Sequence, residues 1–142
     1  MTIAAILANR TFETLTIAAD RPVRDAITIL AEKRIGALPV VQGAAVIGIM
    51  SERDIIYCLK SEGASVLDWT VERIMTAPAI TVEPDKEVLG ALSLMTQRRV
   101  RHLPVVQNGA LIGIVSIGDL VKYRMDKIEA DAAAMLTYIQ SV

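Results

Sequence analysis

The pattern of apolar and polar residues follows one order of elements in the first half of the chain. After a short β-prone stretch, apolar residues recur every three or four positions and predict a helix with one buried face. These residues are Val23, Ala26, Ile27, Leu30 and Ala31. Two apolar strands are predicted next, at Ala37–Val41 and Val46–Met50, joined by a turn at Gln42-Gly43. A second helix is predicted to begin after Ser51, which makes the unit β-α-β-β-α.

The same pattern returns 65 positions later. Aligning residues 16–56 with residues 81–121 without a gap gives 16 identical pairs among 41 positions. The second copy has strands predicted at His102–Val106 and Leu111–Val115, separated by Asn108-Gly109, a strong hairpin signal. Agreement on this scale indicates that the chain is a duplicated unit.

The predicted fold class is α+β (α/β), because strands that are apolar on both faces need helices on one side and further cover on the other. We expect the two βαββα units to cover each other about a pseudo-two-fold axis. The expected domains are residues 1–65, with a core at 14–62, and residues 66–142, with a core at 79–125. Short apolar segments at 3–7 and 71–75 are expected to form one helical turn each, leading into its own repeat. Asp20 and Asp85 are expected to cap the helices that follow them.

The last helix is predicted to continue without Gly or Pro from Asp119 to about Gln140. Its apolar residues alternate four and three positions apart, which predicts an a/d seam. The seam consists of Val121, Met125, Ile128, Ala132, Met135 and Ile139. One unit is too small to bury such a helix. It either folds back against the apolar N-terminal segment or pairs with a second copy, and we favour a homodimer.

Composition narrows the class of protein. The formal net charge of −1 argues against general affinity for nucleic acid or anionic membranes. No apolar run approaches the roughly 18 residues of a membrane span, and the N-terminus lacks the basic region of a signal peptide. One cysteine, Cys58, leaves no internal disulfide and suits a reducing cytoplasm. We therefore expect a cytoplasmic protein.

Two sequence features have candidate chemistry. A Ser-x-x-Asp pattern opens the final helix of each copy, at Ser51/Asp54 and Ser116/Asp119. A serine hydroxyl beside the first N–H groups of a helix favours anions, and a carboxylate accepts hydrogen bonds from a ribose diol. The same pattern is also a helix N-cap, so both interpretations stay open. The second feature is a basic segment without acidic residues nearby. It is either a binding site for phosphate or a solvated helix end. It comprises Arg98, Arg99, Arg101 and His102.

The repeated Leu-Pro-Val-Val and Gly-Ile-x-Ser-x-x-Asp motifs, with a lead-in Val-x-x-Ile-Met-Thr, resemble the cystathionine-β-synthase (CBS) domain family. Two such domains in tandem are similar to a Bateman module. The resemblance implies a cleft between the domains that binds an adenosine-containing ligand as a regulator. Its implied contacts are Ser51, Asp54, Ser116 and Asp119 for ribose or phosphate, Arg99, Arg101 and His102 for phosphate, and Ala79, Ile80 and Pro104 for adenine. Gly36 and Ala37 stand where the second copy has Arg101 and His102, so the second copy is expected to hold the tighter site.

The function expected from the resemblance is a stand-alone, non-enzymatic sensor of adenine nucleotides that requires no cofactor. The sequence contains no pairing of a nucleophile with a base, no metal-spaced cluster and no phosphate-binding glycine loop. AMP, ADP, ATP, NAD(H) and S-adenosylmethionine all stay open as ligands, and the effector protein is unknown. The alternatives are a nucleic-acid-binding protein and a purely structural dimerisation module without a nucleotide.

Overall fold

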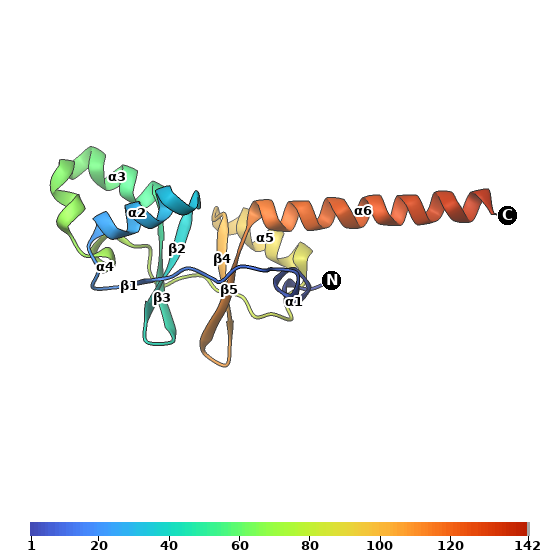
Figure 1. Cartoon of the computed structure of the whole chain (residues 1–142), viewed down its shortest axis with the longest axis horizontal. Helices are drawn as coiled ribbons and strands as arrows, with labels where there is room; N and C mark the ends of the chain where they lie inside the picture. The colour runs from blue at the N-terminus through green and yellow to red at the C-terminus, as the bar shows by residue number, and fades with distance from the viewer. Residues whose placement is uncertain (142) are drawn as a thin grey trace.

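The computed structural model describes residues 1–141 and contains the duplicated unit (Figure 1). The first unit comprises β1 (Ile17–Ala18), α2 (Val23–Lys33), β2 (Ala37–Gln42), β3 (Ala45–Ser51) and α3 (Glu52–Glu62). The second unit comprises α5 (Val88–Arg98), β4 (His102–Gln107), β5 (Ala110–Ser116) and α6 (Ile117–Gln140). Three shorter helices complete the chain: α1 (Ile3–Ala8), the 3-10 helix η1 (Gly63–Asp68) and α4 (Val71–Ile74). The predicted fold class and repeat are confirmed.

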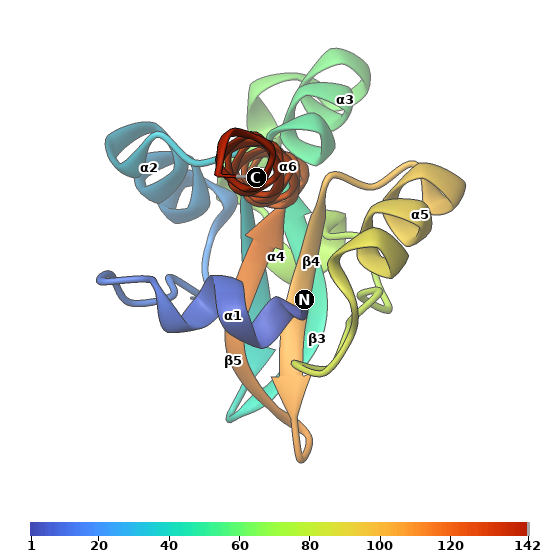
Figure 2. The same cartoon turned by 90° about the vertical axis from the view of Figure 1, so that its right-hand side faces the viewer.

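The two hairpins have the same register. Ala37 lies opposite Ser51 in the first hairpin, and His102 lies opposite Ser116 in the second. The first sheet has a third strand, because β1 pairs in parallel with β2. In the second unit the corresponding stretch makes only one parallel bridge within the described chain, between Val82 and Val105. The hairpins lie side by side, with α2, α3, α5 and α6 toward one end and the hairpin turns at the other (Figures 1 and 2).

The helices α2 and α5 bury most of the stripe that their spacing predicted, but Ile27 is only half-buried and Ala31 is exposed. Val23, Ala26 and Leu30 are buried in the first core, and their counterparts Val88, Ala91 and Met95 are buried in the second. Asp20 and Asp85 are not the N-caps, which corrects that expectation. The helices begin two residues later than such caps require, with Pro22 and Glu87 at the N-cap positions and no side-chain cap. Each helix ends at an arginine in the left-handed conformation.

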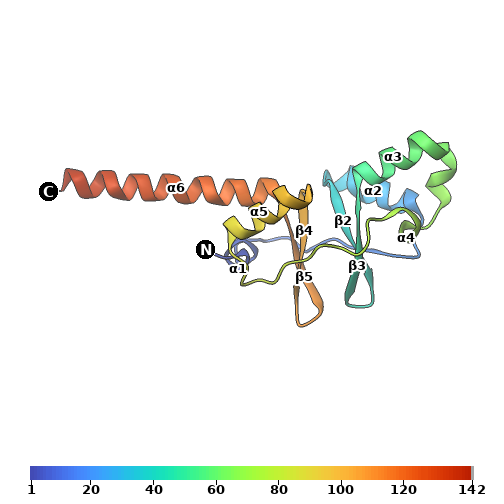
Figure 3. The same cartoon turned by 180° about the vertical axis from the view of Figure 1, so that it is seen from behind.

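The short lead-in helices pack on the opposite units from those expected. In α1, Ile3 and Ile6 are buried in the core of the second unit, and the Ile3 amide donates to the Lys86 carbonyl at 2.9 Å. In α4, Val71 and Ile74 are buried in the core of the first unit. Two linkers therefore cross between the units: linker 1 (residues 10–16) and linker 2 (residues 75–81) (Figure 3). The domain limits near residue 65 stay a prediction along the chain.

Helix α6 extends beyond the unit from which it starts (Figure 1). Leu120 is fully buried in the second core, whereas every residue of the helix from Met125 onward is exposed. The predicted end near Gln140 is confirmed. The alternative in which this helix folds back along its own chain is not what the structure shows, because α1 lies beside only the first turns of α6.

Candidate functional site

A cleft of about 750 Å³ opens between the two units, a volume within the usual range of small-molecule sites. Three parts of the chain form its walls: linker 1, the passage from α2 into β2, and the junction of β5 with α6. His102 also reaches it from the start of β4. The lining residues are Arg10, Phe12, Glu13, Thr14, Leu15, Lys33, Arg34, Ile35, Gly36, Ala37, His102, Ile114, Ser116 and Asp119.

The junction of β5 with α6 supplies the polar floor. Ser116 is the N-cap of α6, and its hydroxyl accepts a hydrogen bond from the Asp119 amide at 3.1 Å. In return, Asp119 Oδ2 accepts from the Ser116 amide at 2.8 Å. This reciprocal capping box confirms the N-cap interpretation of the motif. It uses only one carboxylate oxygen: within residues 1–141, Asp119 Oδ1 accepts no hydrogen bond and is available to a ligand.

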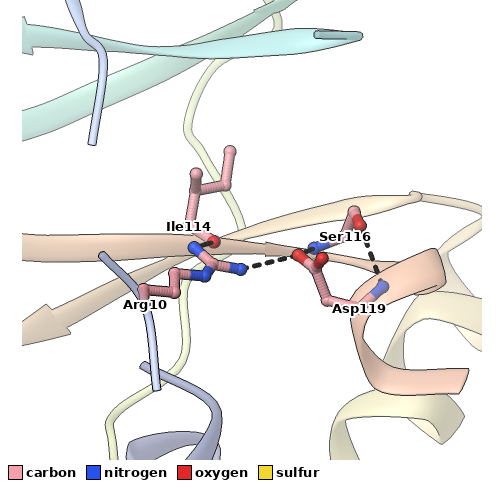
Figure 4. Close-up of polar contacts among 4 residues, drawn as sticks. All are labelled: Arg10, Ile114, Ser116 and Asp119. Atoms are coloured by element: carbon pink, nitrogen blue, oxygen red, sulfur yellow. Dashed lines mark hydrogen bonds and ion pairs between the residues drawn. The ribbon is translucent and has the colours of Figure 1, made fainter. Parts of the chain in front are cut away.

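Arg10, two residues after the end of α1, binds the same oxygen of this carboxylate (Figure 4). One nitrogen of its guanidinium donates to Asp119 Oδ2 at 2.6 Å, and another donates to the carbonyl of Ile114. The Arg10 side chain is only 14% exposed, against 41% for Asp119. The pair therefore lies low in the cleft, where water screens it less than it would a surface pair.

The opposite wall comes from the first unit. Ile35 and Ala37 give it an apolar surface, while Lys33 and Arg34 place two exposed cations at the end of α2. Arg34 has φ 52°, and this left-handed turn ends the helix and sends the chain into β2. Gly36 faces His102 across the cleft: a Cβ at Gly36 would lie 3.2 Å from the imidazole Cε1.

His102 is held in its neutral form at neutral pH. Burial lowers the pKa of His102 below 6.5, and the charge of Arg101 lowers the pKa further. Asp119 and Glu52 act in the opposite direction, with a smaller effect than burial. A neutral imidazole offers one donor and one acceptor to a ligand.

In the corresponding motif of the first unit, both carboxylate oxygens accept hydrogen bonds. Asp54 Oδ2 accepts from the Ser51 amide at 2.9 Å and from the Ser51 hydroxyl at 3.0 Å. The other oxygen accepts from the Thr76 hydroxyl, in linker 2, at 2.9 Å. Ser51 and Asp54 do not line the 750 Å³ cleft.

The structure brings together three of the site residues expected from sequence: His102, Ser116 and Asp119. Arg101 instead points toward Glu52 of the first unit, at 3.9 Å. Pro104 is buried in β4, and its carbonyl accepts from the Val82 amide at 3.0 Å. The remaining expected residues lie outside the lining of this cleft, and their ligand roles stay predictions: Ser51, Asp54, Ala79, Ile80 and Arg99.

Several lining residues that the sequence analysis missed follow from the repeat offset. Thr14, Leu15 and Arg34 are the counterparts, 65 positions earlier, of Ala79, Ile80 and Arg99. Because the linkers cross between units, Asp119 faces the first-copy residues. Arg10 had no such signal: Met75 in the other repeat takes the place of Leu7, and only the folded chain brings Arg10 to Asp119.

Two further observations bear on the chemistry. Within residues 1–141, no group of three or more His, Cys, Asp or Glu side chains is arranged to hold a metal ion. The helices of that same part of the chain are all too short or too polar to cross a membrane.

A family model described as the CBS domain matches residues 9–61 and 71–126. The chain is 37% identical over 126 residues to the mitochondrial CBS domain-containing protein CBSX3 of Arabidopsis thaliana. That match covers 85% of this chain and 61% of the relative, so the chain spans less than two thirds of that protein.

Solved structures are similar over most of the chain. A putative signal-transduction protein with CBS domains from Burkholderia ambifaria is 42% identical, with a TM-score of 0.83, covering 89% of this chain and 95% of its own. The CBS domain pair of protein MJ0100, in complex with 5'-methylthioadenosine and S-adenosyl-L-methionine, is 26% identical with a TM-score of 0.78, covering 89% and 98%. CBSX2 in complex with AMP is 25% identical with a TM-score of 0.76, covering 88% and 96%.

Proposed function

The chain belongs to the CBS domain family, and from this premise we propose that it is a regulatory, non-enzymatic module that binds an adenosine-containing ligand in the cleft between its two units. The observation that carries the proposal is the position of Asp119. Its carboxylate lies in an inter-unit cleft at the start of α6, with Oδ1 unpaired within residues 1–141. A carboxylate in this position can accept a hydrogen bond from a ribose hydroxyl.

The walls of the cleft fit the other parts of such a ligand. Leu15, Ile35 and Ile114 offer apolar surface to a purine ring. Lys33 and Arg34 lie at the exposed rim and are positioned to bind phosphate oxygens by charge-assisted hydrogen bonds. Similar CBS pairs whose structures contain AMP or S-adenosyl-L-methionine support an adenosine ligand for this chain. The proposal covers AMP, ADP, ATP, NAD(H) and S-adenosylmethionine.

Calorimetric titration with these five ligands tests the proposal. We expect at least one to bind with one-to-one stoichiometry per chain. Asp119→Ala should weaken that ligand several-fold to a hundred-fold, because charge-assisted hydrogen bonds of about 1.5–3 kcal/mol are lost. Asp54→Ala is the matched control, since Asp54 occupies the same position in the other repeat, away from this cleft. Equal losses in the two variants, or binding by neither variant nor parent, would contradict the assignment.

We propose that ligand binding reaches an effector protein through dimerisation of this chain. The exposed apolar seam of α6 has the heptad spacing that an identical helix can cover, and in a parallel pair Arg124 of one copy faces Glu129 of the other. We therefore favour a homodimer that presents the ligand state to an effector protein. A dimerisation module without any nucleotide is the competing function, and it predicts an assembly indifferent to the ligand panel.

A further inference from the structure

Arg10 binds the carboxylate that the proposed function assigns to the ligand. It follows the last turn of α1, where its amide donates to the Leu7 carbonyl at 3.1 Å, and from it linker 1 runs to the other unit. Its guanidinium is already bound to two acceptors of its own chain, the Ile114 carbonyl and Asp119 Oδ2. With 14% of the side chain exposed, little of the cation faces the cleft.

The hydrogen bonds at Asp119 determine what a ligand meets. Oδ2 accepts from both the Ser116 amide and Arg10, which uses both of its lone pairs. Oδ1 alone is available. A vicinal diol that donates to both oxygens of Asp119 must therefore displace one of these donors. The Ser116 amide belongs to the capping box of α6, whereas Arg10 is held there by its side chain alone.

In the other repeat the linker binds the aspartate through a different group and at the other oxygen, Oδ1. Its carboxylate, Asp54, is also bound from a linker, but by the neutral hydroxyl of Thr76. Met75 is the counterpart of Leu7, since the two residues lie against the corresponding glycines of the two hairpins, Gly48 and Gly113, and Arg10 has no equivalent in linker 2. A bond between two charged groups is stronger than one from a neutral hydroxyl. The two halves thus differ in how firmly their linkers bind the aspartate.

From this geometry we propose that Arg10 is an intramolecular competitor of the ligand: binding of the ribose diol releases Arg10 from Asp119 and frees linker 1. The inference rests on the proposed function, because it takes Asp119 as the ribose contact. It assigns Arg10 the opposite effect from that expected of a cation lining a nucleotide site. A cation that binds phosphate strengthens binding, whereas a competitor weakens it.

Arg10→Met, which removes the charge and keeps a long side chain, separates these two roles. We expect the variant to bind adenosine and AMP about tenfold more tightly than the parent, because the ligand no longer has to displace one charge-assisted hydrogen bond. If Arg10 binds phosphate instead, the variant loses affinity for AMP and keeps that for adenosine, and the proposal fails. Unchanged affinity for both ligands also overturns it. Arg24→Met is the matched control, because Arg24 forms an exposed pair with Asp68, remote from the cleft lining.

Trypsin gives a readout that does not depend on affinity, because Arg10 is itself a cleavage site. We expect trypsin to cleave the Arg10–Thr11 bond slowly in the ligand-free parent. Mass spectrometry detects the cleavage as the release of residues 1–10. Asp119→Asn should accelerate it several-fold, and Asp54→Asn should not. Saturating AMP should accelerate the same cleavage in the parent, and protection by AMP overturns the proposal. A third outcome is that Asp119→Asn accelerates cleavage but neither AMP nor adenosine binds the parent. That result would show that the Arg10–Asp119 pair exists and that the proposed ligand class is wrong. The role of Arg10 as a competitor would then be refuted as well.

Discussion

Gly36 and His102 face each other across the cleft, and the absence of a side chain on one makes room for the other. A Cβ at Gly36 would lie 3.2 Å from the His102 ring, closer than most side-chain contacts allow. The second repeat has Arg101 at the position of Gly36. Glycine in place of arginine at position 36 removes a possible phosphate contact from the first copy. It also leaves the space that His102 occupies beside the cleft.

Gly36→Val should reduce ligand affinity about tenfold or more, because the branched side chain must displace His102 or fill the cleft. Calorimetry measures the affinity, and thermal unfolding establishes that the variant is folded. Gly90→Ala is the control, since its Cβ would meet only the flexible end of Lys86. Retention of full affinity in folded Gly36→Val would show that the ligand does not approach this wall.

The lowered pKa of His102 predicts a pH dependence of stability. Below pH 6.5 the unfolded chain binds a proton on His102 that the folded chain accepts only at lower pH. The free energy of unfolding should therefore fall as the pH drops from 6.5 toward the lowered pKa. Urea unfolding between neutral pH and about pH 5 measures this, since most carboxylates titrate below that range. His102→Asn should flatten the dependence; the same slope in both proteins would place its origin in other groups.

Phosphate-bearing ligands should bind more tightly than adenosine, and added salt should reduce the difference, because part of the affinity is charge pairing at the rim. The sequence pointed to the arginines near residue 100, whereas the cleft presents Lys33 and Arg34. Lys33→Ala should thus weaken AMP several-fold and leave adenosine unchanged, while Arg98→Ala should affect neither. Titration of a labelled oligonucleotide alongside AMP tests the nucleic-acid alternative. Tight, steeply salt-dependent oligonucleotide binding without AMP binding would favour that alternative.

The projecting part of α6 should mediate self-association. Met125, Ile128, Met135 and Ile139 are each more than half exposed, an apolar row that monomers rarely present to water. Ile128→Glu combined with Met135→Glu should shift the protein toward monomer, because it places unpaired charges in the seam. Ala130→Glu combined with Thr137→Glu adds the same charge on the opposite face and should leave the dimer intact. Sedimentation velocity at micromolar concentration distinguishes the two, and a monomeric parent protein would refute the dimer.

The repeat made most of the fold predictable. Val23, Ala26 and Leu30 mark the buried face of α2, and the same spacing recurs in α5, so each copy supported the other. The positions of Ser51 and Ser116 at helix starts followed from local capping chemistry. Such features depend on near neighbours along the chain, which the spacing of residues reports directly.

The site was less predictable because it joins residues that are distant in sequence. The sequence predicts Asp119 and His102 as site residues together with Ala79 and Ile80 of the same repeat, but only the first two line the cleft. The crossing of the linkers places Asp119 against the first repeat instead, and no local pattern encodes which unit a linker crosses to. The Arg10–Asp119 pair spans 109 positions and has no counterpart in the other repeat, so repetition gave no signal for it.

The exchange of α1 and α4 between the units has a consequence for how the chain folds as it is synthesised. The first unit obtains its α4 from residues that follow it directly, so its core can form early. Helix α1 is synthesised before the first unit, but it packs in one core with Val88, Leu103 and Leu120, which are synthesised after that unit. Ile3 and Ile6 therefore stay uncovered until the residues up to Leu120 have left the ribosome. For this reason the two halves are halves in sequence only: cutting the chain between the repeats would deprive the second unit of α1.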